Sequence, residues 1–220
     1  YIDTLNLPKY MEKYRNSGQL VFKSIKEIMP YDFGAEILPY SDLFRYKMLY
    51  KYGTTWCDMD MVLLKRLPKD DIIISSEATF QSGAFKSKLT FVPNIGVLRF
   101  PKGDQFLENL IFKIEHCFKP AEFCDNMNIF RKMLKNHEYF NYVSPPNVFC
   151  PLPFWQSKES YYEDHYKIKY SVKNQTNDEM INKATAIHCW NNFTTNKHSI
   201  DFSKIHPNSL YSKLYNIIFN

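Results

Sequence analysis

One segment restricts the fold of this chain more than any other: a helical stretch that turns at a glycine into an apolar strand bearing two acids. Residues 40–52 carry apolar side chains at helical spacing, with Ser41 as the expected N-cap and Gly53 as the stop. Residues 54–64 (TTWCDMDMVLL) are β-branched and apolar, which predicts a buried strand. The chain therefore changes from helix to strand with almost no loop between them.

The rest of the chain continues this alternation of strands and helices. A short strand running into a helical turn is predicted for residues 19–29, and helices are predicted for residues 103–118, 126–137 and 208–219. Strands are predicted for residues 72–75, 89–92, 96–100, 167–172 and 184–190. Strands that alternate with helices indicate an α/β layered sheet, and 220 residues can bury a substantial core.

Composition excludes several classes of nucleotide-binding protein. The chain has only 6 glycines, and neither GxGxxG nor GxxxxGK[ST] occurs, so dinucleotide-binding and P-loop folds are excluded. The net charge of +5 suits an anionic partner, whether a nucleic acid, a membrane surface or a phosphorylated small molecule. No run of like charge indicates a nucleic-acid tail.

Cysteine usage and hydropathy indicate a compartment. The five cysteines are odd in number and form no CxxC pair, which predicts reduced thiols rather than a disulfide framework or a thiolate zinc site. The longest uncharged stretch, residues 139–157, contains four prolines and cannot be a membrane-spanning helix. With no apolar leader, we expect a cytoplasmic protein without a transmembrane segment.

The acidic pair Asp58 and Asp60 is the strongest chemical signal. Residues two apart in a strand project to the same face, so these carboxylates repel each other unless a cation lies between them. A hard divalent ion such as Mg²⁺ or Mn²⁺ accepts few carboxylates and leaves room for substrate phosphates. The alternative is a solvated strand end with two acids of no special role.

The preceding helix adds two further polar groups. Asp42 and Arg45 are three residues apart and share one helical face. Because Gly53 leads directly into the acidic strand, all four polar groups can converge at one strand end, where open α/β sheets bind ligands. The alternative is a surface ion pair between Asp42 and Arg45, which contributes little.

This segment resembles a known family. The pattern SDxxRYxxLYxYGxxWxDxD over residues 41–60 is similar to that of sugar transferases with a DXD motif and the GT-A fold, nearest to the retaining group related to glucosylating bacterial toxins. The resemblance implies one GT-A domain over residues 1–220, with a mostly parallel central sheet flanked by helices. It implies a donor and metal site centred on residues 36–100, with the acceptor side and a closing strand and helix in residues 120–220.

The same resemblance implies roles for individual residues. Asp60 matches the acid that ligates Mn²⁺ or Mg²⁺ directly, and Asp58 matches the acid that contacts the donor ribose or the metal. Asp42 and Arg45 match the pair that holds the hydroxyls of the donor sugar. Trp56 stands where the family often has an aromatic residue near the nucleotide.

Weaker matches lie further along the chain. Asn94 and Gly96 resemble a segment near the donor sugar, although a simple turn after Pro93 explains them equally well. His188 and Trp190 resemble the late strand that completes the metal or diphosphate site, and a neutral imidazole is a sound Mn²⁺ ligand. The alternative for His188 is a core histidine. Glu77 could face the acceptor or be a capped strand end, and the strand end is favoured.

Together these observations predict a metal-dependent transferase that moves a hexose from a nucleoside diphosphate sugar, such as a UDP-sugar, to a glycan or protein-linked acceptor. By resemblance, the configuration at the sugar is retained, and no nucleic acid is a partner. Two alternatives remain at this point. One is a nucleotidyltransferase with the same acidic pair, and the other is a non-catalytic module that binds carbohydrate or nucleic acid.

Overall fold

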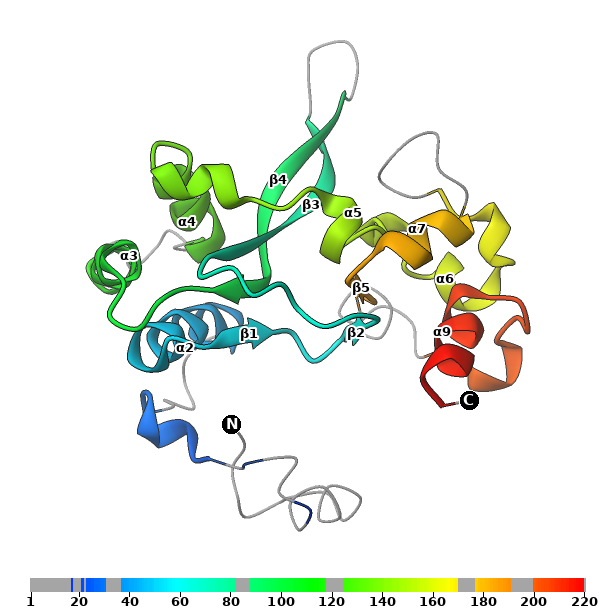
Figure 1. The fold of residues 1–220 in the computed structure, drawn as a ribbon, viewed down its shortest axis with the longest axis horizontal. Coiled ribbons are helices and arrows are strands. Elements are labelled where there is room, and N and C mark those ends of the chain that lie inside the picture. The colour runs from blue at the N-terminus through cyan, green and yellow to red at the C-terminus, as the bar shows by residue number, and fades with distance from the viewer. Residues whose placement is uncertain are drawn as a thin grey trace. The chain divides into compact units, whose positions relative to one another are not determined.

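The computed structural model describes residues 17, 21, 23–30, 37–81, 88–117, 125–169, 177–190 and 200–219 (Figure 1). Contacts divide the chain into two compact units. The first comprises Tyr1–Thr54 and Phe100–Phe130, and the second comprises Thr55–Arg99 and Arg131–Asn220. Among the described residues, no helix has the length and apolar character needed to cross a membrane.

The first unit is helical where it is described. It contains η2 (Ile25–Glu27), α2 (Ile37–Tyr52), α3 (Gln105–Glu115) and the first part of α4 (Asn126–Leu134). α2 packs against α3, and aromatic stacking fills the space between the elements. The ring centroids of Tyr46 and Phe130 are 5.9 Å apart, and those of Phe100 and Phe106 are also 5.9 Å apart. All four rings are buried, so this unit has its own core.

The prediction for α2 is wrong at its N-terminal end and right at its C-terminal end. The expected N-cap Ser41 is wrong, because α2 begins at Ile37 and Ser41 lies inside it. Pro39 is tolerated there because amides of the first turn have no intrahelical acceptor. The stop at Gly53 is confirmed, with a φ of +61° and a hydrogen bond from its N–H to Leu49 O of 2.8 Å. A Cβ at this position would collide with the backbone of Lys102, so only glycine fits.

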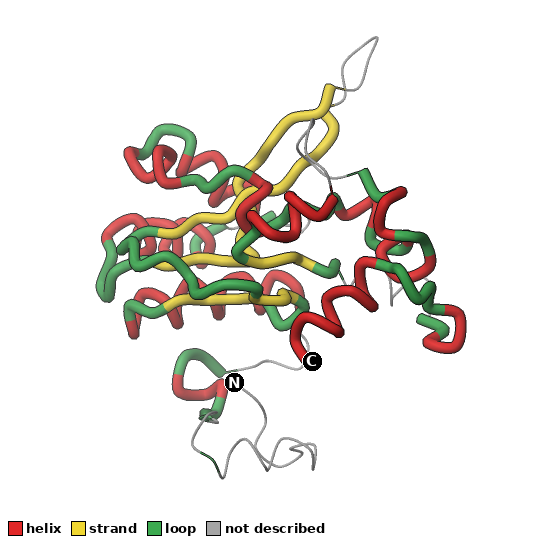
Figure 2. Tube along the Cα trace, turned by 45° about the vertical axis from the view of Figure 1, so that its right-hand side comes forward, coloured by secondary structure: helices red, strands yellow, loops and turns green. Residues whose placement is uncertain are grey.

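The second unit contains two small antiparallel sheets. β1 (Thr55–Cys57), β4 (Lys88–Arg99) and β3 (Ile73–Gln81) form one sheet in that order, and β2 (Met61–Leu63) pairs with β5 (Ala186–His188) in the other. β3 and β4 run side by side as the long pair of yellow strands in Figure 2. The predicted α/β class holds, but the mostly parallel central sheet is wrong for the described strands.

The antiparallel arrangement follows from the order of the elements. β3 ends at Gln81 and β4 begins at Lys88, and consecutive strands joined by so short a connection pair antiparallel. The expected strands 89–92 and 96–100 are a single strand, and Pro93 pairs with Ser76 beside a shift in register rather than breaking the strand. A shift of this kind is typical of a β-bulge, where a proline is tolerated.

Three further expectations need correction. The strand predicted over residues 54–64 is two strands, β1 and β2, separated by a turn. Residues 165–167 form a 3-10 helix and residues 168–169 have no strand, while the remainder of the predicted strand 167–172 lies outside the described residues. Cys117 is disulfide-bonded, contrary to the expectation of reduced thiols, whereas Cys57, Cys150 and Cys189 are free as expected.

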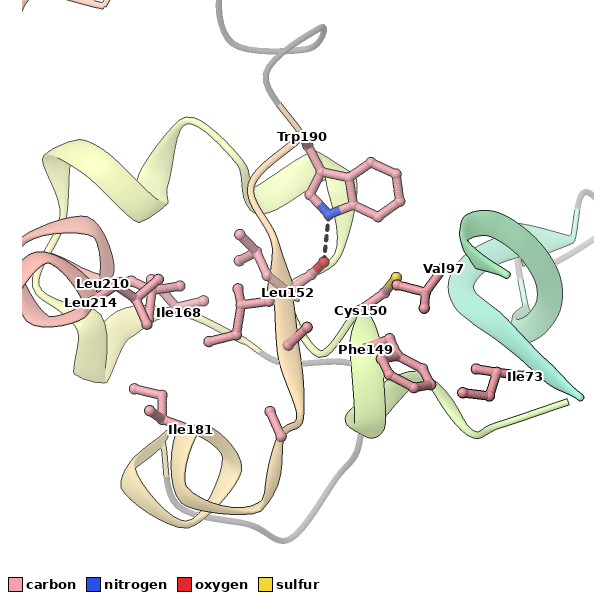
Figure 3. Close-up of a cluster of buried hydrophobic side chains, with 13 residues drawn as sticks. Ile73, Val97, Phe149, Cys150, Leu152, Ile168, Ile181, Trp190, Leu210 and Leu214 are labelled. Atoms are coloured by element: carbon pink, nitrogen blue, oxygen red, sulfur yellow. Dashed lines mark hydrogen bonds between the residues drawn. The ribbon is translucent and has the colours of Figure 1, made fainter. Parts of the chain in front are cut away.

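Helices from the C-terminal half of the chain bury one side of β5. They are α5 (Pro146–Phe149), α6 (Glu159–Tyr162), α7 (Asn177–Lys183) and α9 (Leu210–Phe219), with 3-10 turns η3 (Glu138–Tyr142), η4 (Phe154–Gln156), η5 (His165–Lys167) and η6 (Phe202–Lys204). Apolar residues of α5, α7 and α9 form one buried cluster with Ile73, Val97 and Ile187 (Figure 3). This cluster fixes β5, and with it the residue at its end, His188.

Candidate metal centre

Asp58 and Asp60 lie in the turn between β1 and β2, not within a continuous strand as predicted. The turn is closed by Met61 N–H, which donates to Asp58 O at 3.2 Å, and anchored by Asp58 N–H, which donates to Gly96 O at 2.8 Å. Met59, between the two acids, is 92% exposed. The turn therefore sends the apolar residue outward and leaves the carboxylates on its inner side.

His188 joins the two acids through the pairing of β2 with β5. Met61 is the register partner of His188, and Cys189 N–H donates to Asp60 O at 2.8 Å. His188 Nε2 lies 3.0 Å from Asp60 Oδ1. One ligand atom from each of Asp58, Asp60 and His188 lies within 4.8 Å of the others, so the three residues predicted as metal ligands lie close together.

Trp56 orients the carboxylate of Asp58. The indole Nε1–H donates to Asp58 Oδ1 at 2.7 Å, within the ordinary range of a strong hydrogen bond to an ionised acceptor. This contact occupies one carboxylate oxygen and leaves Oδ2 directed at the space beside Gly96. A hydrogen-bond donor that contacts a metal ligand fixes the orientation of that ligand and thereby affects the affinity for the metal.

Gly96 lies beside Asp58 and His188, and we call its backbone the floor of the centre. A Cβ added there would lie 3.3 Å from Asp58 Oδ2, 3.5 Å from His188 Nδ1 and 2.8 Å from Asn94 Oδ1. The missing side chain therefore leaves room between a carboxylate and an imidazole nitrogen. His188 is buried, and its Nδ1 has no hydrogen-bond partner among the described residues. Because a buried polar atom without a partner is costly, this nitrogen suits a site that gains a ligand.

A chain of hydrogen bonds holds the backbone of Gly96 in place. Arg131 Nη2–H donates to Glu77 Oε1 at 2.8 Å, and Asn94 Nδ2–H donates to Glu77 Oε2 at 3.0 Å. Asn94 Oδ1 in turn accepts the Gly96 N–H at 2.6 Å. Burial raises the pKa of Glu77, while the Arg131 charge and the Asn94 amide oppose that rise. The carboxyl interpreted from sequence as a plain strand end thus supports the backbone that anchors Asp58.

Trp190 supports the imidazole from its buried side. Its ring stacks on that of His188 with centroids 3.8 Å apart and an interplanar angle of 25°. The indole Nε1–H donates to Leu152 O at 2.7 Å, as Figure 3 shows. Trp190 also has a φ of +56°, a region that a non-glycine residue occupies only when its surroundings impose it. These contacts hold His188 in one orientation.

The free cysteines beside the centre are not thiolates. Burial, and then the charges of Asp58 and Asp60, raise the pKa of Cys57 to about 11. Burial, and then the charge of Asp60, raise the pKa of Cys189 to about 12. Both groups are therefore protonated thiols at neutral pH, and the donor atoms that the centre offers are oxygen and nitrogen.

Two family models match the chain. The glycosyltransferase sugar-binding region containing DXD motif matches residues 2–79, which include Asp58 and Asp60. The alpha 1,4-glycosyltransferase conserved region matches residues 100–218, which is more than half of the chain and includes His188. The chain belongs to this glycosyltransferase family. Searches of curated proteins and of solved structures each found no match.

Membership of the family decides between the functions left open by the sequence. The protein is a glycosyltransferase, so the alternatives of a nucleotidyltransferase and of a non-catalytic binding module are set aside. The residues that could hold a metal come from both matched segments of the glycosyltransferase, because β2 and β5 bring the acidic pair and His188 together.

The remaining predicted residues of the glycosyltransferase lie in different surroundings. Asp42 Oδ1 and Arg45 Nη2 lie 3.3 Å apart on α2, in the first unit, as the ion pair considered as the alternative to a donor-binding role, and Arg45 is buried. Trp56 and Asn94 contact Asp58 and Glu77 respectively. Glu77 and Arg131 were not predicted as site residues. The signal available for Glu77 was an acid shortly after the apolar run IIIS, but no local pattern indicated Arg131 as its partner.

Proposed function

We propose that this glycosyltransferase transfers a hexose from a UDP-sugar to a glycan or protein-linked acceptor, with retention and with the help of Mn²⁺ or Mg²⁺. The observation that carries the proposal is the convergence of Asp58, Asp60 and His188 within 4.8 Å. A centre of this kind suits a diphosphate leaving group, since the family acts on sugars and the chain has no glycine-rich phosphate loop.

The donor set fits the proposed ion. Two ligands of one Mg²⁺-sized ion lie at most about 4.2 Å apart, twice a bond of about 2.1 Å, so small adjustments suffice. Two carboxylates and one imidazole suit Mn²⁺ well, because both ligand types bind it and no soft thiolate competes. The side chain of His188 is only 7% exposed, which matches a ligand held in place before the ion binds.

Each residue has a proposed task in the reaction. Asp58, Asp60 and His188 hold the ion, which when bound neutralises the charge that develops on the departing UDP. Trp56 and Trp190 keep Asp58 and His188 in their orientations through the contacts described above. These residues thereby set the position of the diphosphate.

The sugar is handled by other groups in this proposal. Asp42 and Arg45 hold its hydroxyls, which fixes the ring for attack on the anomeric carbon. Asn94 and Gly96 are also assigned to the donor site in this proposal. We assign no nucleophile to the protein. The acceptor hydroxyl therefore attacks from the face that UDP leaves, which retains the configuration.

A panel of nucleotide sugars tests the proposal. Released UDP is measured with each donor, with and without Mn²⁺, for the wild type, for Asp60→Asn and for Asp71→Asn, an exposed acid away from the centre. We expect Mn²⁺-dependent release from at least one UDP-sugar, unchanged in Asp71→Asn and lowered at least about a hundredfold in Asp60→Asn. Equal release by Asp60→Asn and the wild type would refute the assignment of the centre.

A further inference from the structure

β4 leaves its regular pairing with β3 at the point where it passes the metal centre. In the register of the two strands, Ser75 alone lies opposite residues 94–97, which therefore form a bulge. The bulge contains Gly96, whose carbonyl oxygen accepts the Asp58 N–H at 2.8 Å. Bulges are common beside active sites, where they redirect part of a strand. The shape of this bulge sets the position of the floor relative to Asp58 and His188.

Buried side chains supply hydrogen bonds to the backbone of the bulge. Ser75 Oγ accepts the Val97 N–H at 3.0 Å and donates its own proton to Asn94 O, also at 3.0 Å. Asn94 Oδ1 accepts the Gly96 N–H at 2.6 Å. Ser75 and Asn94 are 0% and 4% exposed, so water has little access to replace these bonds. The shape of the bulge therefore depends on the orientation of the Asn94 side chain.

Glu77 fixes that orientation. Because Asn94 Oδ1 accepts a backbone N–H, the amide must present Nδ2 as a donor on its other side. Glu77 Oε2 accepts from this Nδ2 at 3.0 Å. The side chain of Glu77 is only 15% exposed, and a carboxylate in such surroundings requires a compensating positive charge.

Arg131, on α4, supplies this charge and also reaches the bulge directly. Its Nη2–H donates to Glu77 Oε1 at 2.8 Å, and its Nε–H donates to Pro93 O, also at 2.8 Å. Pro93 is the residue immediately before the bulge. The planar guanidinium thus holds two acceptors in a fixed geometry, which the single ammonium group of a lysine does not reproduce. All of these residues belong to the second unit.

We propose that Arg131 is a positioning residue for glycosyl transfer, which acts through Glu77 and Asn94 to hold the floor of the centre in place before the ion binds. The inference rests on the proposed function, because it takes the metal centre as the place where the donor is held. Ligands that are already in place need no rearrangement when the ion binds, so losing Arg131 should weaken metal binding. An ion pair that only stabilised the fold would leave metal affinity unchanged.

Titration of Mn²⁺ into protein saturated with UDP, followed by electron paramagnetic resonance, distinguishes these two roles. Arg131→Met and Arg131→Lys are compared with two controls on α4: Lys132→Met, which removes an exposed neighbouring charge, and Leu134→Val, which shortens a fully buried side chain. We expect Mn²⁺ affinity about tenfold weaker in Arg131→Met, with Arg131→Lys between it and the wild type. Both controls should bind Mn²⁺ as the wild type does, although Leu134→Val lowers Tm.

Hydrogen exchange at the Gly96 amide gives a second readout, in protein without Mn²⁺ or UDP. The chain has only 6 glycines, so labelling glycine with ¹⁵N allows this amide to be followed by NMR. We expect exchange at least about fivefold faster in Arg131→Met than in the wild type, because the bond from Gly96 to Asn94 is weakened. Lys132→Met should exchange at the wild-type rate.

Wild-type affinity for Mn²⁺ in every Arg131 variant that folds would overturn the proposal and leave the metal centre itself standing. An equal loss of affinity in Leu134→Val and Arg131→Met would also overturn it, because the effect would then follow stability alone. If the wild type with UDP binds no Mn²⁺, the proposed function is refuted and this inference with it. Arg131→Lys keeps the test meaningful if Arg131→Met fails to fold, because it retains the positive charge beside Glu77.

Discussion

Replacing Gly96 with alanine perturbs the metal centre without removing a ligand. The added methyl group would lie 2.8 Å from Asn94 Oδ1, 3.3 Å from Asp58 Oδ2 and 3.5 Å from His188 Nδ1. The 3.5 Å distance is an ordinary van der Waals contact, the 3.3 Å distance requires Asp58 to move by a few tenths of an ångström, and the 2.8 Å distance is well inside van der Waals contact. Asn94 must therefore retreat, and its 2.6 Å hydrogen bond from the Gly96 N–H is lost or lengthened.

The expected cost follows from these contacts. Losing a buried hydrogen bond costs about 1 kcal/mol, and overpacking a tight site costs about 1–3 kcal/mol. Together these costs amount to about 2–4 kcal/mol, which for a chain of 220 residues corresponds to a fall in Tm of about 4–16 °C. Because the same shift moves the groups around Asp58 and His188, we expect the affinity for Mn²⁺ to fall about 10–100-fold.

Calorimetric titration of UDP in the presence of Mn²⁺, together with thermal unfolding, measures both effects. Gly103→Ala is the matched control, since Gly103 also has a positive φ but nothing lies within 4 Å of its added Cβ. That variant should lose some stability through backbone strain and keep full affinity for UDP with Mn²⁺. If Gly96→Ala binds UDP and Mn²⁺ as tightly as the wild type, the reasoning about the floor of the centre is wrong.

Three further substitutions test the surrounding contacts. Trp56→Phe keeps the ring but loses the 2.7 Å hydrogen bond to Asp58, so Mn²⁺ affinity measured by titration should fall about tenfold with little change in Tm. Trp190→Phe loses the 2.7 Å hydrogen bond to Leu152, which should lower the free energy of unfolding in urea by about 1–2 kcal/mol. For Glu77, burial raises the pKa in the folded state, so the folded protein binds the proton more tightly than the unfolded chain. The free energy of unfolding of the wild type should therefore fall relative to that of Glu77→Gln as pH rises above 4.5, and parallel pH profiles of the two proteins would contradict this.

Local patterns predicted single elements of this fold well but not their pairing. The helix over α2 and its stop at Gly53 follow from spacing and from a glycine with positive φ. The direction of pairing does not follow from such patterns, because it depends on which strands are adjacent in space. β2 and β5 pair although they are far apart in the sequence, and β4 keeps Pro93 within the strand through a shift in register. The run of apolar residues around Met59 also concealed a turn whose apolar member faces solvent.

The candidate site also has parts that the sequence predicted and parts that it did not. The acidic pair and His188 were predictable because each residue type suits a cation and their order matches the family. The supporting contacts of Arg131 and Trp190 were not predictable, because each joins residues that are distant in the sequence. Arg131 reaches Glu77 from α4, and Trp190 is oriented by the carbonyl of Leu152. The spacing of residues along a single sequence does not indicate which distant residues form such contacts.

Direct titration of Mn²⁺ tests the central claim that Asp58, Asp60 and His188 form one metal centre. Free Mn²⁺ is followed by electron paramagnetic resonance as it is added to the wild type, Asp60→Asn, His188→Gln and the control Asp71→Asn, each saturated with UDP. The account predicts one bound Mn²⁺ for the wild type and the control, and affinity at least about tenfold weaker in the other two. Wild-type affinity in both Asp60→Asn and His188→Gln would contradict it.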